Sequence, residues 1–413
     1  MRPACECSVI IPTHNRAAVL RATLARLREL PDRAFEVIVL DNGSTDETSA
    51  LAADHPDVRW IHLSRNIGCA ARNLGAAAAE GRVLLMLDDD SHPAPGVIDA
   101  LGGLFACDAS LAAMACRVRL TDPPHRHDAG GVPGIFFNCG GAVRREAFLA
   151  VGGYPTDYEY YAEEYDLACK LWRNGWRVEP RGELLVWHGR VTRNRDNNRM
   201  LRLLVRNNVR MWARHAPASL RADLIESTFE RYERVARKEG AMAGFEAGRA
   251  EARAILSRGV KSRPMSELQF ERLMGLDRAC AAIRSWADKC AVRRVAVWGR
   301  GKGCEQLLDL LKKTGLWLER VYDGGGDSGI WRNAEVVSTD AFDGSGVDGV
   351  VIGSLSPGVA EDEAERLSAT WPGLPVVSPA PWLGAESPAV SSARHASIAG
   401  LPVETGTRPG ALV

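Results

Sequence analysis

The stretch Leu85-Met86-Leu87-Asp88-Asp89-Asp90 joins an apolar run to three consecutive carboxylates. The run starts at Arg82 and predicts a buried strand, because it is short and almost entirely hydrophobic. Adjacent carboxylates repel one another, so a cation or hydrogen-bond donors must offset their charge. A hard divalent ion shared with substrate phosphates satisfies this requirement. The simpler alternative is an acidic turn whose aspartates cap a helix.

The residues before this stretch alternate between β-rich runs and helical patterns. This alternation predicts an α/β fold in which helices cover both faces of a mostly parallel sheet. Three earlier strands are expected at 8–11, 35–40 and 58–63. Polar residues follow the first two of them, at 13–15 and 41–44. Ligands of open parallel sheets bind beyond the carboxyl ends of the strands, so we expect these polar clusters and the three aspartates at one ligand-binding edge.

Four segments carry a more specific pattern through their order along the chain. They are Val9-Ile-Ile-Pro-Thr-His-Asn-Arg16, Asp41-Asn-Gly-Ser-Thr-Asp46, Asn66-x-Gly68 with Ala71-Arg-Asn-x-Gly75, and Leu87-Asp-Asp-Asp90. Each segment alone has a simple structural explanation, such as a capped helix start or an ion pair made by Arg72. Together they resemble glycosyltransferase family 2, the inverting enzymes with the GT-A nucleotide-diphospho-sugar transferase fold. The resemblance covers about the first 200 residues.

The resemblance implies a nucleotide site. The segment from Pro12 to Arg16 would line the base and ribose, and the Asp41 carboxylate would accept a hydrogen bond from a pyrimidine ring N–H. Arg72 would lie against the base or the diphosphate, because a guanidinium fork suits either role. The implied nucleotide contacts are Pro12, Thr13, Asn15, Arg16, Asp41, Asn66, Gly68, Arg72, Asp88 and Asp89.

The resemblance also implies a metal site for Mg2+ or Mn2+. Asp88 and Asp90 match the family's D-x-D pair, with Asp90 on the metal and Asp88 on the ribose or a metal-bound water. His188, which ends a predicted strand, is implied as a further ligand of the metal or diphosphate. A histidine satisfied by its own surroundings is the alternative. The metal would stabilise charge on the leaving nucleoside diphosphate.

The stretch Ala162-Glu163-Glu164-Tyr165-Asp166-Leu167 resembles the family's acidic motif, which more often reads Glu-Asp-x-Asp-Leu ahead of Gly-Trp. A single in-line displacement needs one base within hydrogen-bond reach of the attacking hydroxyl. By alignment with the motif, Glu164 is the expected base and Glu163 the second candidate. The alternative is that these carboxylates only cap the helix expected at 164–174, a role that Asp166 suits.

An arginine row follows, with members three or four residues apart on one helical face: Arg199, Arg202, Arg206 and Arg210. We expect a solvated row. The alternative is that these arginines, or Arg193 and Arg195 before them, contact the diphosphate or an anionic acceptor.

A second α/β unit is predicted after a helical connector. Its marker is Val297-Trp-Gly-Arg-Gly-Lys-Gly-Cys-Glu305, a strand, a glycine turn and a helix, with Asp323 ending the next strand. The third glycine is one place early for G-x-G-x-x-G. The unit resembles small Rossmann-like accessory domains, and an NAD site is the alternative. The expected domains are 1–215 (GT-A catalytic), 216–290 (helical connector), 291–383 (Rossmann-like) and 384–413 (flexible tail).

Composition limits the remaining function classes. The 52 Lys and Arg balance the 52 Asp and Glu, which argues against nucleic-acid binding through a global positive field. The 10 cysteines are scattered, as in proteins with reduced thiols. No apolar run approaches the roughly 18–20 residues of a membrane span, and the first residues lack a signal-peptide pattern. These features predict a cytoplasmic protein with no integral membrane segment.

These patterns predict a metal-dependent, hexosyltransferase-type enzyme. The expected donor is a nucleotide-diphosphate sugar, with a UDP-sugar first, and the acceptor a hydroxyl or other nucleophile of a small molecule, glycan or carrier. A homodimer through the Rossmann-like unit is a further expected interaction. One alternative is a sugar nucleotidyltransferase, although that class needs a Gly-x-Gly-x-Arg loop where this chain has Pro12 to Arg16. The other is a non-catalytic protein that binds a nucleotide sugar (a nucleotide-sugar-binding protein) or presents a partner surface on the Rossmann-like unit. The partner-binding form leaves the three aspartates and the Glu163 and Glu164 pair without a purpose.

Overall fold

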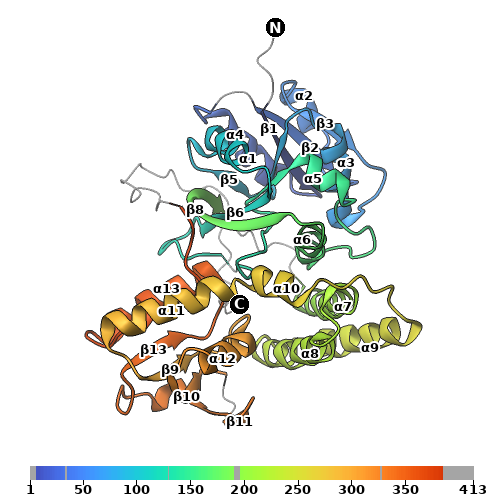
Figure 1. Ribbon diagram of the computed structural model, residues 1–413. Coiled ribbons are helices and arrows are strands. Elements are labelled where there is room, and N and C mark those ends of the chain that lie inside the picture. The colour runs from blue at the N-terminus through green and yellow to red at the C-terminus, as the bar shows by residue number, and fades with distance from the viewer. Residues whose placement is uncertain (1–5, 33–34, 129, 190–195, 326–327, 385–413) are drawn as a thin grey trace. The chain divides into compact units, whose positions relative to one another are not determined.

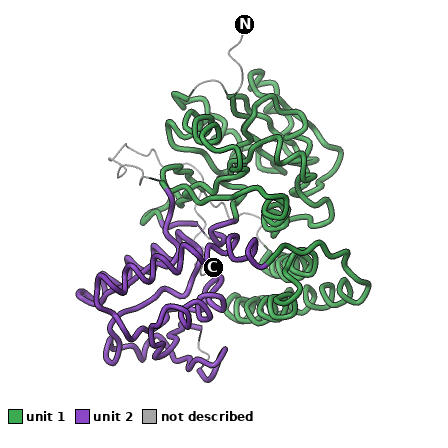
Figure 2. The backbone as a smooth tube through the Cα atoms, in the orientation of Figure 1, with its two compact units in different colours: residues 1–125, 135–266, 384–410 green, residues 126–134, 267–383, 411–413 purple. Residues whose placement is uncertain are grey.

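The computed structural model describes residues 6–32, 35–128, 130–189, 196–325 and 328–384. The chain divides into two compact units, shown in Figure 2. Unit 1 comprises residues 1–125, 135–266 and 384–410, and unit 2 comprises residues 126–134, 267–383 and 411–413.

Unit 1 is built on an eight-stranded mixed sheet with the strand order β3-β2-β1-β4-β7-β6-β8-β5 (Figure 1). Its strands are β1 (Cys7–Thr13), β2 (Phe35–Asp41), β3 (Arg59–His62), β4 (Val83–Met86), β5 (Ser91–Pro93), β6 (Leu111–Leu120), β7 (Gly141–Arg144) and β8 (Arg177–His188). The first four strands pair in parallel, whereas β7 runs antiparallel to β4 and β6. The predicted α/β class and parallel first half are confirmed.

Unit 1 contains helices that cover both faces of this sheet and a further group, α7 to α9, that packs mainly on itself. They are α1 (Ala17–Arg28), α2 (Leu51–Asp54), η1 (Gly68–Ala70), α3 (Ala71–Ala78), α4 (Val97–Cys107), α5 (Arg145–Ala150), α6 (Glu163–Arg173), α7 (Asn197–His215), α8 (Arg221–Lys238) and α9 (Met242–Arg258). Leu20 of α1 and Leu101 of α4 share a core with Val9 on one face. On the other face α3 packs closely, since a Cβ at Gly75 would lie 2.8 Å from Ile10 Cγ2.

Strand register brings the polar clusters to one edge. Thr13 pairs with Asp41, and Asp41 pairs with His62, so the carboxyl ends of β1, β2 and β3 are level. Met86 pairs with Ile10, and the chain then runs into the three aspartates at the same edge. The predicted ligand edge is therefore present in the sheet.

Helices α7, α8 and α9 form the middle region of the chain, where a helical stretch is predicted. A Cβ at Gly244 would lie 2.1 Å from the Asn198 carbonyl oxygen, and one at Gly248 would lie 2.5 Å from the Arg202 carbonyl oxygen. Both glycines therefore allow the backbones of α9 and α7 to approach closely. The close approach ties α9 to α7 within unit 1.

Unit 2 contains a six-stranded mixed sheet with the order β11-β12-β10-β9-β13-β14. Its elements are α10 (Glu267–Met274), α11 (Leu276–Cys290), β9 (Arg294–Trp298), α12 (Cys304–Lys312), β10 (Trp317–Asp323), β11 (Gly329–Trp331), β12 (Ala334–Ser338), η2 (Thr339–Ala341), β13 (Gly349–Ile352), α13 (Pro357–Thr370) and β14 (Val376–Val377). The predicted second α/β sheet is confirmed. The domain boundaries expected at residues 215 and 290 stay predictions, and residues 385–413 of the expected tail lie outside the described residues.

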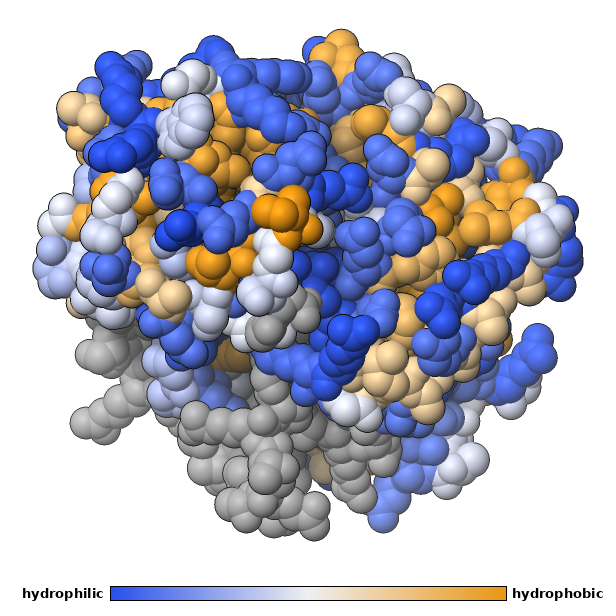
Figure 3. Space-filling view, turned by 90° about the horizontal axis from the view of Figure 1, so that it is seen from below, coloured by the Kyte–Doolittle hydropathy of each residue, from blue (hydrophilic) through white to orange (hydrophobic). Residues whose placement is uncertain are grey.

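Among the described residues, no helix combines the length and apolar character needed to cross a lipid bilayer. On the face drawn in Figure 3, hydrophobic residues occur in small groups among hydrophilic ones.

Candidate active site

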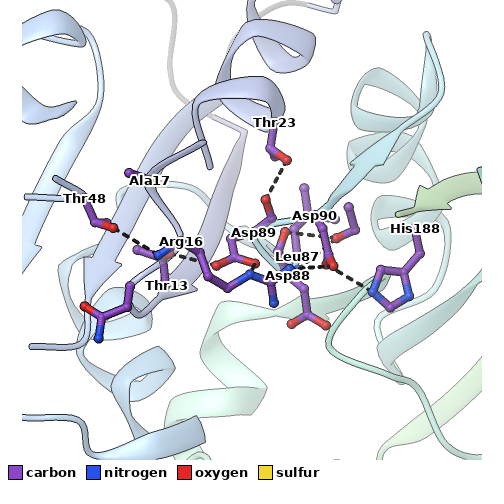
Figure 4. Close-up of polar contacts among 12 residues, drawn as sticks. Thr13, Arg16, Ala17, Thr23, Thr48, Leu87, Asp88, Asp89, Asp90 and His188 are labelled. Carbon is purple, nitrogen blue, oxygen red and sulfur yellow. Dashed lines mark hydrogen bonds and ion pairs between the residues drawn. The ribbon is translucent and has the colours of Figure 1, made fainter. Parts of the chain in front are cut away.

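Asp88, Asp90 and His188 converge at the carboxyl edge of the unit 1 sheet. Each offers a ligand atom, and these atoms all lie within 4.8 Å of one another. His188 reaches the aspartates because it pairs with Ser91, the first residue of β5. Its Nε2 lies 3.1 Å from Asp90 Oδ1, as Figure 4 shows. Two carboxylates and an imidazole form a donor set that suits Mn2+, and the carboxylates suit Mg2+.

Asp89 lies away from this group. Its Oδ2 accepts a hydrogen bond from Thr13 Oγ1 at 2.7 Å, and its backbone carbonyl accepts one from Thr23 Oγ1 at 2.6 Å. Burial raises the pKa of Asp89 to about 7 although Arg16 opposes the rise. Asp89 therefore fastens the acidic segment to β1 and α1, and its side chain is separated from the Asp88, Asp90 and His188 cluster.

Two arginines offset the charge of the outer aspartates. Arg16 Nη2 lies 2.9 Å from Asp90 Oδ2, and Arg72 Nη2 lies 2.5 Å from Asp88 Oδ1. Arg72 is buried and also donates to the Leu87 carbonyl at 3.2 Å. The offset that adjacent carboxylates require is thus supplied by two residues of the implied nucleotide set.

Asp41 is held in its ionised form at the end of β2. Its Oδ1 accepts from the Ser44 backbone N–H at 3.0 Å, and its Oδ2 is contacted by Ser49 Oγ and by His62 Nδ1. Burial acts to raise the pKa of Asp41, but the hydrogen bonds from Ser44 and Ser49 lower it below its ordinary value. His62 was not singled out from the sequence, although its position at the end of a predicted strand was a usable signal.

Asn15 joins the first two polar loops. Its φ of 54° is left-handed, a conformation that asparagine tolerates better than most residues. Its Oδ1 accepts from the Thr45 backbone N–H at 2.7 Å, and its own N–H donates to Ser44 Oγ at 2.9 Å. Pro12 precedes this loop within β1 and is half-buried. The two loops implied to line the base and ribose are therefore bonded to each other.

The Asn66 and Gly68 segment contacts a different part of unit 1. Asn66 Oδ1 accepts from the Gly68 N–H at 2.9 Å, and the Asn42 amide donates to the Gly68 carbonyl at 3.1 Å. Gly68 has a φ of 68°, and a Cβ there would lie 2.2 Å from the Glu159 carbonyl oxygen. Only glycine fits this contact, which brings the segment against the residues that precede α6.

Glu163 and Glu164 are the first two residues of α6, and both are buried. Asn138 Nδ2 donates to Glu163 Oε1 at 3.0 Å, and the Asn138 backbone N–H donates to Glu164 Oε1 at 3.4 Å. Tyr154 Oη in turn donates to Asn138 Oδ1 at 2.5 Å. Burial raises the pKa of both glutamates, and the charge of Glu164 raises that of Glu163 further. A carboxylate with a raised pKa is suited to general-base chemistry near neutral pH.

The Asp166 side chain makes contacts beyond the helix capping that the sequence suggested for it. Its fully buried carboxylate contacts His215 Nε2 at 2.9 Å, Arg214 Nη1 at 3.0 Å and Lys170 Nζ at 2.6 Å. Burial opposes ionisation, but the hydrogen bond from His215 and the charge of Lys170 hold the pKa of Asp166 below its usual range. Asp166 therefore anchors α6 to α7.

The arginine row on α7 is paired with acidic side chains. Arg206 Nη1 lies 3.1 Å from Glu159 Oε1 and 3.5 Å from Glu251 Oε2, while Arg210 pairs with Asp157. Arg202 Nη1 lies 2.8 Å from Glu251 Oε1. The prediction of a simply solvated row is wrong for these residues, because unit 1 supplies their counter-charges. Arg193 and Arg195 lie outside the described residues.

In unit 2, the first backbone N–H groups of the glycine turn after β9 are engaged in hydrogen bonds. The Gly301 N–H donates to the Gly353 carbonyl at 2.8 Å, and the Arg300 N–H donates to Asp323 Oδ1 at 3.1 Å. Arg300 Nη2 also lies 2.7 Å from Asp323 Oδ2. Dinucleotide sites use such amides for the pyrophosphate and such a carboxylate for the ribose. These internal contacts argue against the NAD site considered as an alternative.

The comparison with known families agrees with the arrangement in unit 1. Residues 8–147 match the sequence model of the family described as Glycosyl transferase family 2. The N-terminal part of unit 1 is a family 2 glycosyltransferase domain. The matched segment of this domain contains the first three polar loops and the aspartates, whereas Glu163, Glu164 and His188 follow it.

Several curated proteins are similar to parts of the family 2 domain. An uncharacterized glycosyltransferase of Haemophilus influenzae is 27% identical over 186 residues, which cover 40% of this chain and 61% of the relative. Chondroitin synthase of Escherichia coli is 32% identical over 126 residues, 29% of this chain and 18% of the relative. Validoxylamine A glucosyltransferase of Streptomyces hygroscopicus is 36% identical over 104 residues, which cover 23% of this chain and 24% of the relative. The chain thus spans less than two thirds of these relatives.

Solved structures give weaker similarity. A mannosyltransferase from Pyrobaculum calidifontis, solved with GDP-Man and Mn2+, has a TM-score of 0.42 and 21% identity, covering 70% of this chain and 84% of the other. GalNAc-T7, solved with UDP, GalNAc and Mn2+, has a TM-score of 0.44 and 16% identity, and the match covers 56% of this chain and 51% of GalNAc-T7.

Proposed function

We propose that this protein is a metal-dependent, inverting glycosyltransferase that moves a sugar from a nucleotide-diphosphate sugar to an acceptor nucleophile. The observation that carries the proposal is the cluster of Asp88, Asp90 and His188 at the carboxyl edge of a family 2 domain. The acceptor class is a hydroxyl or other nucleophile of a small molecule, a glycan or a carrier.

The donor site would lie over the loops that follow β1 and β2. Asp41 supports binding of a pyrimidine base, because its ionised carboxylate is an acceptor for a ring N–H. A UDP-sugar is therefore the donor that we propose first. Arg16 and Arg72 would turn from the aspartates toward the diphosphate, for which a guanidinium fork is well suited.

Mg2+ or Mn2+ would be held by Asp90, Asp88 and His188. The oxygen-rich donor set fits either ion, and the imidazole adds a ligand that Mn2+ accepts. When bound, the ion supplies Lewis-acid stabilisation of the negative charge on the leaving nucleoside diphosphate. Arg16 provides the positive charge beside Asp90 in the structure, so ion binding requires this ion pair to loosen.

The proposed base is Glu164. Its Oε1 accepts a long hydrogen bond of 3.4 Å from the Asn138 backbone N–H. Glu163 is less suited, because its Oε1 already accepts a hydrogen bond of 3.0 Å from Asn138 Nδ2. Glu164 would accept the proton of the acceptor nucleophile as that atom attacks the anomeric carbon and the nucleoside diphosphate leaves.

A donor screen tests the proposal. The protein would be incubated with Mn2+ and a panel of UDP-, GDP- and dTDP-sugars, with simple glycosides and polyols as acceptors, and products measured by mass spectrometry. We expect a product one sugar heavier than the acceptor with at least one donor, and none with Glu164→Gln. Absence of transfer and of donor hydrolysis across the panel would contradict the proposal.

A further inference from the structure

The turn at residues 158–162, which leads into α6, has an unusual backbone. Glu159, Tyr161 and Ala162 have φ values of 64°, 71° and 64°. Residues with a Cβ seldom adopt this left-handed conformation, and they keep it only where the surroundings hold it. Because Ala162 immediately precedes Glu163, the shape of this turn sets how the acidic pair enters α6.

One side chain of α7 holds most of this turn. The Asn207 Nδ2 lies 2.9 Å from the Tyr158 carbonyl oxygen, 2.8 Å from that of Tyr160 and 2.9 Å from that of Tyr161. Asn207 is fully buried. Three carbonyls around one atom identify it as the amide nitrogen, since a side-chain oxygen there would be repelled. The two N–H bonds of a single buried amide are thus shared among three backbone carbonyl oxygens of a strained segment.

Asn207 is itself fixed from the other side. Its Oδ1 accepts a hydrogen bond from Arg206 Nε at 2.9 Å, and Arg206 Nη2 donates to the Tyr158 carbonyl at 2.9 Å. The far side of the turn is held by the Cys69 N–H, which donates to the Glu159 carbonyl at 2.7 Å. The turn is therefore held between α7 and the segment that begins at Gly68, and Asn207 makes the largest number of its recorded hydrogen bonds.

We propose that Asn207 is a positioning residue that holds the 158–162 turn in the shape needed to present Glu164 to the acceptor. This inference rests on the proposed function. Asn207 lies beyond residues 8–147, so α7 becomes part of the catalytic unit although the family match ends before it. Without the Asn207 amide the turn relaxes toward ordinary φ values, Ala162 rotates, and the acidic pair moves while the loops that follow β1 and β2 stay in place.

The test compares two neighbouring buried amides. Asn207→Ala removes the three contacts to the turn. Asn208→Ala is the matched control, because Asn208 is also buried in α7 but donates to the Leu204 carbonyl and to Tyr232 Oη of α8. Asn207→Asp keeps the volume and places an acceptor against the carbonyls, and Asn207→Gln keeps the amide donor one methylene further out.

Hydrogen exchange of the peptide that contains residues 158–162 measures the turn without requiring catalysis. We expect faster exchange in Asn207→Ala and Asn207→Asp than in wild type and Asn208→Ala, with partial recovery in Asn207→Gln. In transfer assays kcat should fall about tenfold or more in Asn207→Ala, since small misplacements of a reacting group cost rate steeply. The Kd of UDP with Mn2+ should stay within about threefold, and the pH midpoint of kcat should move toward that of an ordinary glutamate.

Equal exchange of the turn in Asn207→Ala and Asn208→Ala would overturn the positioning role. So would an unchanged kcat and pH profile in a variant whose turn exchanges faster. If Asn207→Ala does not fold, the same readouts on Asn207→Asp and Asn207→Gln decide the question. A wild-type protein that transfers no sugar, with the exchange difference still present, would instead refute the proposed function.

Discussion

Arg16 and His188 contact different oxygens of the Asp90 carboxylate. Arg16 Nη2 lies 2.9 Å from Oδ2, and His188 Nε2 lies 3.1 Å from Oδ1. The proposed metal ligand therefore has a positive side chain against one oxygen and an imidazole against the other. This relationship makes Arg16 a competitor of the cation until the donor diphosphate offers it another anionic partner.

Removal of Arg16 should strengthen binding of the cation alone. Arg16→Gln takes one positive charge from beside Asp90, and we expect Mn2+ to bind about tenfold more tightly without nucleotide, a change of about 1.4 kcal/mol. UDP should bind more weakly in the same variant, because the diphosphate loses a partner. Titration of Mn2+ followed by electron paramagnetic resonance measures the first effect. Weaker Mn2+ binding in Arg16→Gln would contradict the competition.

Neutralisation of the two glutamates should separate their roles. Glu164→Gln should retain UDP binding and lower kcat by about a hundredfold or more, the usual loss of a general base. Glu163→Gln should have the smaller effect, because Asn138 Nδ2 already donates to Glu163 Oε1 at 3.0 Å. Single-turnover rates and calorimetry on both variants check this. The reverse order of losses would assign the base to Glu163.

The pH dependence of kcat should follow the raised pKa values of the glutamate pair. The base acts when deprotonated, so kcat should rise with pH through a midpoint above that of an ordinary glutamate. Because the charge of Glu164 raises the pKa of Glu163, Glu164 ionises while Glu163 is still neutral, so Glu163→Gln should leave that midpoint nearly unchanged. Below the midpoint the folded state binds more protons than the unfolded state, so the pair's contribution to stability falls as pH rises from the ordinary value to the raised one. A midpoint at or below pH 4.5 would contradict the assignment.

Two glycine variants should differ in stability although both positions have positive φ. Gly68→Ala places a Cβ 2.2 Å from the Glu159 carbonyl oxygen, whereas nothing lies within 4 Å of a Cβ at Gly175. Gly175→Ala should therefore cost only conformational strain, about 1 kcal/mol, and Gly68→Ala more than about 2 kcal/mol. Thermal denaturation of both variants compares them. Equal shifts in Tm would show that the contact with the 158–162 turn is unimportant.

The sequence predicted those features that depend on local pattern. Short apolar runs predicted β1 to β4 of the first sheet and β9 and β10 of the second, and the rule for parallel sheets placed Asp41 and the aspartates at one edge. Asp89 bonds to Thr13 and Thr23 instead of joining Asp88 and Asp90, and side-chain alternation could not predict this, because β4 ends at Met86, before all three aspartates.

The residues that hold the acidic pair and its turn in place could not be predicted from local sequence patterns. Asn138 bonds to glutamates 25 and 26 residues away, and Asn207 bonds to carbonyls between 46 and 49 residues away. Such pairings depend on how α6 and α7 pack, for which a single asparagine in a helical pattern gives no signal. The pairing of Arg206 with Glu159 and Glu251 depends on the same packing.

Calorimetric titration of UDP tests the central claim most directly. The wild-type protein should bind UDP with Mn2+ present and at least about tenfold more weakly with a chelator, since Asp90 and Asp88 would hold an ion that offsets the charge of the diphosphate. Asp90→Asn should bind UDP equally weakly under both conditions, while the exposed control Asp309→Asn should behave as wild type. Identical UDP affinity with and without Mn2+ in the wild-type protein, or an unchanged Mn2+ effect in Asp90→Asn, would contradict the account.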